Sequence, residues 1–431
     1  MSIGRPRGTR DFAPDEMAQR NEAAARLRRV FDRFGYREVA TPTFEQLELF
    51  TAKSGEGIIS ELYNFEDKGG RQVTLRPELT APVMRMVYQD HAFDPKPLKW
   101  FYYANCFRYD RPQTGRYREF WQFGCEQVGA GTPLAYAELI ALADGCFEEL
   151  GLAGRDLAVG HVGLLKQAID DLELQPEIHS NLMRVIDKEG WGESTALSLE
   201  RHGCPTGAIR HAERLLSAKS LEELRGGLEQ DARFQELEAT FEHLQALGVD
   251  ARLNLGIARG LDYYTGIVFE VHSPALGAQS QLLGGGGYDL SGVFGAQSMP
   301  TMGFGLGFDR TLVALEAEGA QLPAPVGPVA YFGALGEAAQ ARVLGLVKEL
   351  RGDRIPVDMD LVGRKPGQIA KHADAVGAHY LVILGDRDLE NGAARVKDLR
   401  SEGGEQHDVP LDDLLHWLTV RSGHDDLKDY N

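Results

Sequence analysis

The chain has 431 residues, of which 43% are hydrophobic and 26% are charged. That length suits about three domains of ordinary size with a large core, and that composition is typical of a soluble globular protein. The formal net charge of −18 argues against indiscriminate binding to polyanions. It does not exclude nucleic acid as a partner, because a local basic groove can act within an acidic protein.

The sequence predicts neither a membrane span nor an export signal. No apolar run approaches the ~20 residues that a transmembrane helix needs. The N-terminus mixes arginines with early acidic residues and lacks an apolar core. The four cysteines are Cys106, Cys125, Cys146 and Cys204, and no pair has CxxC spacing. We therefore expect no zinc site and no redox motif, but reduced, buried thiols in a cytoplasmic protein.

The first predicted element is a helix. Pro14 followed by Asp15 and Glu16 favours a helix start, because proline suits the first turn and acids suit its positive end. Apolar spacing continues this helix to Gly35. Residues 38–40 then read as a strand, which Pro42 ends.

Residues 98–108 and 117–128 are two strand-like runs, and the loop between them is rich in turn residues and charge. They predict an antiparallel hairpin with a long basic tip. Strand alternation divides the second run into two faces. One face carries Arg118, Phe120, Gln122, Gly124 and Glu126, and the other carries Glu119, Trp121, Phe123 and Cys125. We expect the second set to pack a core, whereas the first set fits either a ligand site or a solvated face.

The pattern is helical and highly charged from about 165 to 246, which indicates an inserted helical module, and strand patterns resume at 251–255. Residues 321–328 hold three prolines and a glycine and predict a linker. Beyond the linker, strands and helices alternate, which predicts a separate, small and mostly parallel sheet with crossover helices. The expected elements are strands at 329–333, 355–358 and 380–384, helices at 337–351, 366–376 and 411–419, and a hairpin at 393–409.

The candidate functional residues lie mainly in two glycine-rich segments and one polar segment. Residues 259–266 place an arginine, an aspartate and two tyrosines before the apolar run 267–269. Such residues can be core or edge packing, but buried polar groups without partners cost about 1–3 kcal/mol each. Four consecutive glycines at 284–287 suggest backbone that closely approaches another group. Residues 302–310 carry a GxGxG pattern without the βαβ context of a dinucleotide site, and the chain has no GxxxxGK[ST] motif.

These segments resemble the class II aminoacyl-tRNA synthetases. Pro42, after the first helix and strand, is similar to their motif 1. Residues 107–110 with 116–120 are similar to motif 2, and residues 303–310 to motif 3. Within that class, residues 259–266 and 285–289 resemble the two histidine-specific motifs of the histidyl-tRNA synthetases. The resemblance runs from about residue 8 to about residue 418.

The resemblance implies an α+β fold, with an antiparallel sheet that binds ATP and histidine. Residues 1–325 would form the catalytic domain, with the helical insertion at about 165–246. Residues 326–421 would form an α/β anticodon-binding domain, and residues 422–431 a tail. The family also implies a homodimer through motif 1, tRNA(His) as a partner, Mg²⁺ with ATP, no organic cofactor and no dedicated metal ligands.

The resemblance assigns roles to individual residues. The histidine-binding set would be Glu78, Leu79, Thr80, Arg108, Gln122, Glu126, Arg259, Tyr263 and Tyr264. Within it, Glu126 and Tyr264 would hold the imidazole ring, and Gln122 the amino or carboxylate end. Some family members have glycine where this chain has Leu79. A contact from the ligand to the backbone would survive that difference, whereas a close approach of the ligand to this position would be affected.

The same resemblance assigns the phosphate and RNA contacts. Arg108 would contact the α-phosphate, Arg116 the γ-phosphate, and Arg310 the adenine or γ-phosphate. Arg259 and Arg108 would be catalytic. Arg111 and Gln113, on the motif 2 loop, would reach the tRNA acceptor stem, unless that loop is a surface connector.

Two alternatives to histidine–tRNA ligation fit the sequence less well. A regulatory paralogue would keep the fold without charging tRNA, but such relatives lack the C-terminal module and degrade the arginine-led histidine motif. This chain retains both features. A synthetase for another amino acid does not fit residues 259–266.

Overall fold

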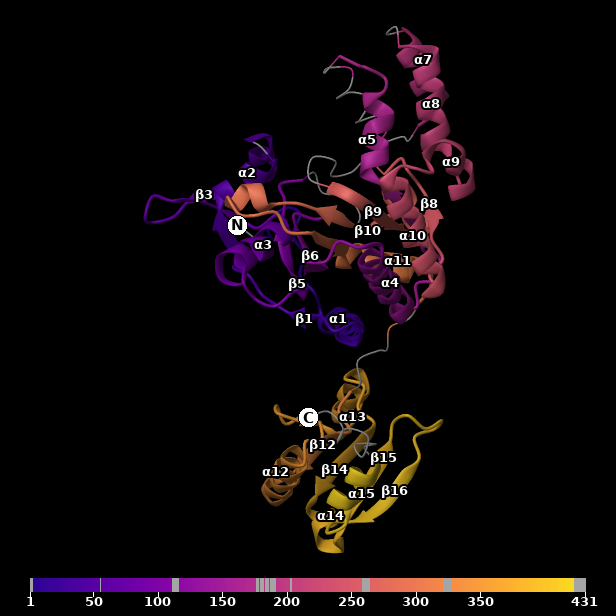
Figure 1. Ribbon diagram of the computed structural model, residues 1–431. Coiled ribbons are helices and arrows are strands. Elements are labelled where there is room, and N and C mark those ends of the chain that lie inside the picture. The colour runs from indigo at the N-terminus through magenta and orange to yellow at the C-terminus, as the bar shows by residue number, and fades with distance from the viewer. Residues whose placement is uncertain are drawn as a thin grey trace. The chain divides into compact units, whose positions relative to one another are not determined.

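The computed structural model divides the chain into two compact units, Met1–Pro323 and Ala324–Asn431 (Figure 1). It describes residues 3–54, 56–110, 116–175, 178, 182, 186, 191–201, 204–257, 264–320, 322 and 327–421. Among those residues, every helix is too short or too polar to cross a bilayer.

An eight-stranded sheet forms the centre of the larger unit. Its strand order is β1-β5-β6-β11-β10-β9-β7-β8. The pairs at the two edges, β1 with β5 and β7 with β8, are parallel, and the pairs between them are antiparallel. The strands are β1 (Arg37–Glu38), β5 (Leu98–Phe107), β6 (Glu119–Val128), β7 (Asp156–His161), β8 (Arg252–Leu253), β9 (Tyr264–His272), β10 (Gln281–Tyr288) and β11 (Thr301–Gly307).

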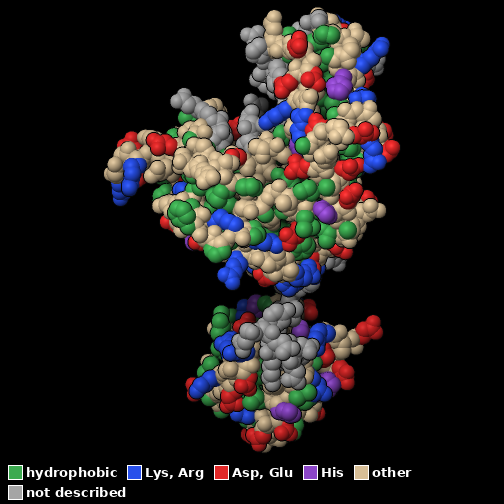
Figure 2. All heavy atoms as spheres, in the orientation of Figure 1, with side chains coloured by type: hydrophobic (Ala, Val, Ile, Leu, Met, Phe, Trp, Pro, Cys, Tyr) green, Lys and Arg blue, Asp and Glu red, His purple; other side chains and the backbone are tan. Residues whose placement is uncertain are grey.

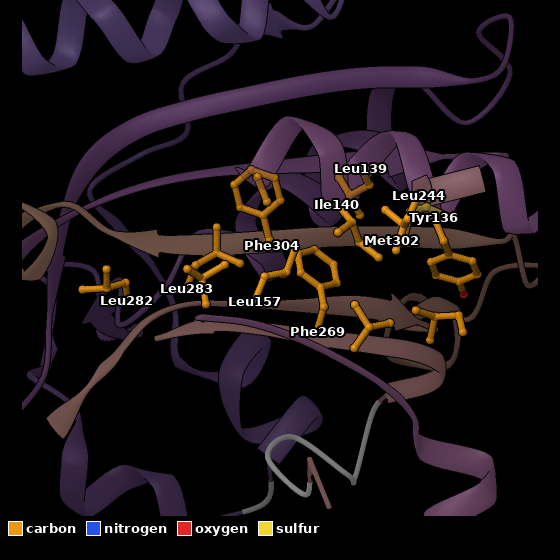
Figure 3. Close-up of a cluster of buried hydrophobic side chains, with 14 of the residues drawn as sticks. Tyr136, Leu139, Ile140, Leu157, Leu244, Phe269, Leu282, Leu283, Met302 and Phe304 are labelled. Atoms are coloured by element: carbon orange, nitrogen blue, oxygen red, sulfur yellow. The ribbon is translucent and has the colours of Figure 1, made fainter. Parts of the chain in front are cut away.

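Helices α1 (Pro14–Arg33), α4 (Pro133–Leu150) and α10 (Ala232–Ala246) enclose the main hydrophobic core with this sheet. Figure 3 shows Tyr136 and Ile140 of α4 in one cluster with Phe269, Met302 and Phe304 of the sheet. Local signals fix the ends of α4. The Thr132 hydroxyl accepts a hydrogen bond from Ala135 N, and Gly151 ends the helix in the left-handed region with φ 80°.

A second, three-stranded sheet has the order β2-β4-β3. Its strands are β2 (Phe44–Gln46), β3 (Asn64–Glu66) and β4 (Gln72–Leu75), and beside them lie α2 (Leu47–Ser54), the 3₁₀ helix η1 (Glu56–Glu61) and α3 (Thr80–Asp90). Two further 3₁₀ helices, η2 (Pro274–Gln279) and η3 (Ser291–Phe294), flank β10, and α11 (Phe308–Ala317) follows β11. The segment that resembles motif 3 is therefore a strand that leads directly into a helix.

The helical prediction for about 165–246 is confirmed where the structure describes this segment. It contains α5 (Val162–Asp170), α7 (Glu193–Arg201), α8 (Thr206–Ser217), α9 (Leu221–Leu228) and α10. Helix α5 starts earlier than expected, at Val162, and α10 packs on α4 of the main body. The apolar residues of α8, including Ile209 and Leu215, are buried in the main core cluster.

The smaller unit is built on a five-stranded sheet of order β13-β12-β14-β15-β16. The strands are β12 (Ala330–Leu335), β13 (Val357–Met359), β14 (Tyr380–Gly385), β15 (Ala393–Asp398) and β16 (Gln406–Pro410). The helices are α12 (Glu337–Gly352), α13 (Pro366–Ala375), α14 (Asp386–Asn391) and α15 (Leu414–Arg421).

Three local expectations need correction. The strand predicted at 38–40 is Arg37–Glu38, because Val39 N makes the last backbone hydrogen bond to the sheet, to Phe101 O. The hairpin predicted at 393–409 is confirmed as the antiparallel pair β15–β16, but the sheet is less parallel than predicted, since β14–β15 is also antiparallel. Helix α14 was not predicted from the sequence; its first turn is fixed by Asp388, which accepts a hydrogen bond from Gly385 N at 2.8 Å.

Candidate active site

Strand β6 carries different side chains on its two faces, as the alternation predicted, although Glu119 and Trp121 of the expected core set are only half-buried. The same two faces continue across β10 and β11. Phe123 and Cys125 of β6 are fully buried in the main core. Glu126, Gly124 and Gln122 lie on the opposite face, where their register partners on β11 are Gly303, Gly305 and Gly307. This face of the sheet, which we call the site face, therefore combines polar side chains with a run of glycines.

Glu126 is the most buried polar group on the site face, with 1% of its surface exposed. The Tyr102 hydroxyl of β5 donates to its Oε1 at 3.1 Å. The Tyr288 hydroxyl of β10 donates to its Oε2. The carboxyl group is thus held between phenols from two neighbouring strands.

Burial raises the pKa of the Glu126 carboxyl to about 8, and hydrogen bonds from Tyr288, Thr80 and Tyr102 lower it only in part. The pKa of each of the Tyr102 and Tyr288 hydroxyls is also raised well above 10, first by burial and then by the Glu126 charge. Burial accordingly favours the protonated form of Glu126. A ligand with a positive or hydrogen-bond-donating nitrogen would favour its ionised form.

Glycines serve two different purposes in this sheet. A Cβ at Gly303 would collide with Glu126 Oε2, and a Cβ at Gly124 with the Tyr102 hydroxyl, so these glycines make room for the polar cluster. Among the described residues, a Cβ at Gly305 would meet nothing closer than Gln122 Nε2 at 3.7 Å, so this glycine leaves an open floor in that part of the structure.

The consecutive glycines of β10 include two that face the core. A Cβ at Gly285 would lie 2.6 Å from Phe269 Cζ and Phe304 Cβ. A Cβ at Gly287 would collide with the Tyr136 hydroxyl. The sequence predicted that the backbone of these glycines closely approaches another group. At Gly285 and Gly287, that group is an aromatic side chain of the core.

Residues 76–80 form one border of the site face. The buried Arg76 donates to Asn105 O, Thr41 O and Asn105 Oδ1 at 2.8 to 3.0 Å, which fixes this segment against β5. The Glu78 carboxylate accepts from Thr80 N at 2.7 Å and from Ala81 N, at the start of α3. Leu79 is 2% exposed and packs with Tyr102, so its side chain points into an apolar cluster.

The three arginines expected at ATP lie on different elements. Arg108 Nε donates to Pro77 O at 2.9 Å, and its guanidinium lies over the Phe120 ring. Arg116 pairs with Asp110 at 3.0 Å and is half-exposed. Arg310 donates to Gln281 O at 2.8 Å from the first turn of α11.

Several expected site residues lie outside the described residues, namely Arg111, Gln113, Arg259 and Tyr263. Tyr264 opens β9 and is the register partner of Tyr288. The predicted buried strand after it is confirmed, since Ile267, Val268 and Phe269 are at most 1% exposed.

Sequence reasoning gave no role to three side chains that the structure brings to this site. Tyr102 and Tyr288 hold Glu126, and the Cys106 thiol donates to Gln122 Oε1 at 3.4 Å. Alternation along 98–108 could have placed Tyr102 and Cys106 on one face of their strand. It could not have aligned that strand with β6.

Acidic and basic side chains are interspersed on the face of the larger unit that Figure 2 shows. Within the described residues, no group of three or more His, Cys, Asp or Glu side chains could hold a metal ion. Cys106, Cys125 and Cys146 are buried free thiols, whereas Cys204 is only half-buried, which corrects the expectation for that residue.

Comparisons with known families agree with this geometry. A family model described as histidyl-tRNA synthetase matches residues 8–311. A model described as anticodon binding domain matches residues 329–421. The first match contains the whole site face, and the second contains nearly all of the five-stranded sheet unit.

Similar proteins cover nearly the full length of the chain. A protein named histidine–tRNA ligase from Archaeoglobus fulgidus is 46% identical over 429 residues, which are 97% of this chain and 100% of that protein. One of the same name from Methanosarcina acetivorans is 43% identical over 97% of this chain and 99% of its own. The crystal structure of apo S. aureus histidyl-tRNA synthetase superposes with a TM-score of 0.73 at 27% identity and covers 97% of this chain and 100% of that one.

Proposed function

The chain belongs to the histidyl-tRNA synthetase family, and on that premise we propose that it ligates L-histidine to tRNA(His) with ATP. The histidine carboxylate attacks the α-phosphorus of ATP, which gives histidyl-adenylate and releases pyrophosphate. The terminal ribose of the tRNA then takes the histidyl group from the adenylate. The buried Glu126 beside an open glycine floor is the observation that carries this proposal.

Glu126 explains selectivity for histidine. An imidazole ring offers two polar nitrogens at fixed spacing, and one of them can pair with the Glu126 carboxylate. An amino acid without such a nitrogen would leave this buried group unpaired, which is the basis of strong discrimination. We propose that Tyr263 and Tyr264 complete the ring contacts, with Glu78, Thr80 and the Leu79 backbone at the α-amino group.

Gln122 is suited to the other end of the amino acid. Its Oε1 accepts from the Cys106 thiol, so its amide nitrogen faces the open floor at Gly305. An amide N–H₂ group can donate to a carboxylate there.

Phosphate binding is assigned to arginines, because a guanidinium is permanently charged and forked. Arg108 and Arg259 would contact the α-phosphate and stabilise charge that develops in the displacement. Arg116 and Arg310 would bind the γ-phosphate or adenine end. Mg²⁺ would enter with ATP as part of the substrate.

We assign tRNA binding to two separate parts of the chain. Arg111 and Gln113 would contact the acceptor stem, and the domain at 326–421 would bind the anticodon, in line with the match of residues 329–421 to an anticodon binding domain. The catalytic domain would be 1–325, with the insertion at about 165–246. The remaining residues, 422–431, would be a tail.

We further propose a cytoplasmic homodimer. Phe44 is 56% exposed, lies next to motif 1, and is the kind of apolar residue that an interface covers. The free cysteines are compatible with a reducing compartment.

Pyrophosphate exchange with each amino acid in turn tests the proposal. Exchange should depend on histidine, and histidine should then be transferred to tRNA(His). Histidine-independent exchange, or preference for another amino acid, would refute the assignment. Absence of charging despite normal exchange would favour the regulatory alternative.

A further inference from the structure

A buried polar network joins the N-terminal segment to both sides of the candidate active site. Asp309, at the start of α11, is 3% exposed. Its Oδ1 lies 2.5 Å from Arg10 Nη2 and 2.7 Å from Arg20 Nη1. Its Oδ2 accepts from Trp121 N at 2.6 Å. One carboxylate thus connects residue 10, helix α1, strand β6 and helix α11.

Aromatic rings complete this network. Two guanidinium groups face one carboxylate, so the cluster holds one excess positive charge that burial would make costly. The Arg10 guanidinium carbon lies 3.6 Å from the centre of the Tyr117 ring, and that of Arg20 lies 4.0 Å from the centre of the Phe12 ring. Cation–π attraction is strongest for such partly desolvated groups. Tyr117 and Asp309 are therefore held against the same guanidinium, that of Arg10.

The main chain of the N-terminal segment is anchored beside this network. Gly8 O accepts from Arg118 N at 2.8 Å. Gly8 has φ +84°, and a Cβ there would lie 2.8 Å from Arg118 Cγ, so the segment runs flat against that side chain. Arg118 O in turn accepts from Arg108 N at 2.9 Å. We call residues 8–12 the N-terminal strap.

We propose that the N-terminal strap is a positioning device for ATP, and that Arg10 is its central positioning residue. The inference rests on the proposed function. Arg116 is the neighbour of Tyr117, and Arg310 is the neighbour of Asp309. By holding Tyr117 and Asp309 at a fixed spacing, Arg10 sets the separation of the two arginines assigned to the far end of ATP. Donors that are fixed in advance bind charge more effectively than donors that must first reorganise.

The test is Arg10→Ala. In histidine-dependent pyrophosphate exchange, its KM for ATP should rise between about 10- and 100-fold, the range that a displacement of about 1 Å can cause, while KM for histidine changes little. Arg10→Lys should give an intermediate rise, because lysine keeps a charge near Asp309 but loses the flat group on Tyr117. Arg5→Ala is the control, since the Arg5 side chain is 58% exposed on the same segment. It should leave both KM values unchanged.

Tyr117→Leu is a second, milder variant in case Arg10→Ala folds poorly, because Tyr117 is only half-buried. It should also raise KM for ATP selectively. Calorimetric titration of wild type and both variants with ATP measures the same effect without histidine, so it is independent of the proposed amino acid. If both variants melt at lower temperature but bind ATP normally, the strap is merely structural and the inference is wrong.

Discussion

The two faces of strands β6 and β11 differ in side-chain chemistry, although their residues alternate along the same chain. On the core face, Phe123 stacks on Phe31 with a centroid distance of 5.9 Å, and Phe304 lies 6.0 Å from the same ring. On the site face, Glu126 and Gln122 stand among glycines. A register slip by one residue would exchange the two faces. The tight aromatic packing on one face therefore also fixes the geometry of the other.

Glycine meets opposite needs on the two faces of the sheet. Gly285 is required because aromatic side chains fill the space beside it, whereas no described residue fills the space beside Gly305. Glycine content alone therefore does not identify a ligand floor. The space around each Cα decides which role a glycine has.

The largest expected effect lies on the core face. Phe123→Ala removes a ring that stacks on Tyr103 at 4.4 Å and is fully buried. We expect a loss of about 3–5 kcal/mol in the free energy of unfolding, from lost burial plus a cavity. Urea unfolding measures it. A loss below about 1 kcal/mol would show that this face is not a tightly packed core.

The second prediction concerns pH and lies on the site face. The folded pKa of Glu126 is raised from 4.5 to about 8, so the folded protein binds a proton that the unfolded chain releases in this range. The free energy of unfolding should therefore fall as pH rises from about 4.5 through about 8, by on the order of a few kcal/mol. Glu126→Gln should lack this fall, and at alkaline pH it should gain stability relative to wild type.

Urea unfolding of both proteins at a series of pH values tests this expectation. Parallel pH curves for the two proteins would contradict the raised pKa. The same variant should raise KM for histidine far more than KM for ATP. Equal effects on both substrates would contradict the assignment of Glu126 to the imidazole ring.

The sequence alone predicted which side chains share a face of one strand. It did not predict which residues of neighbouring strands lie opposite each other. Phe123 and Cys125 were expected in the core and are fully buried, because the period of two belongs to the strand itself. The partners of Glu126, Tyr102 and Tyr288, come from positions 24 and 162 residues away. No local pattern specifies how those strands align.

The polar network at Asp309 was missed for the same reason. Its arginines are 299 and 289 residues away in the chain. The roles given to Glu126 and Gln122 came from resemblance to a family, and they stay predictions. The alternation of residues 117–128 placed both on one face without deciding between a site and a solvated surface.

The third prediction compares two glycines. In Gly285→Ala, the new methyl group would meet Phe269 and Phe304 at 2.6 Å, and neither ring can withdraw from a packed core without cost. We expect a loss of about 1–3 kcal/mol, typical of overpacking. Gly305→Ala, whose nearest new contact is 3.7 Å, should leave the unfolding free energy nearly unchanged. Equal losses in thermal or urea unfolding would contradict the distinction between the two glycines.

The smallest expected effect compares two buried cysteines on opposite faces, Cys106 and Cys125, both 0% exposed. Substitution by alanine should cost each protein a similar amount of stability, since each loses one sulfur from packed surroundings. Cys106→Ala should also raise KM for histidine by about two- to tenfold, the value of one ordinary hydrogen bond, because Gln122 loses the thiol that orients its amide. Cys125→Ala should leave that KM unchanged.

Cys106→Ser should restore the wild-type KM for histidine, because a hydroxyl can donate to the same Oε1 of Gln122. If the two alanine variants change KM for histidine equally, the Cys106 thiol does not orient Gln122. Only the side chains that touch the ligand would then distinguish the site face from the core face in substrate binding.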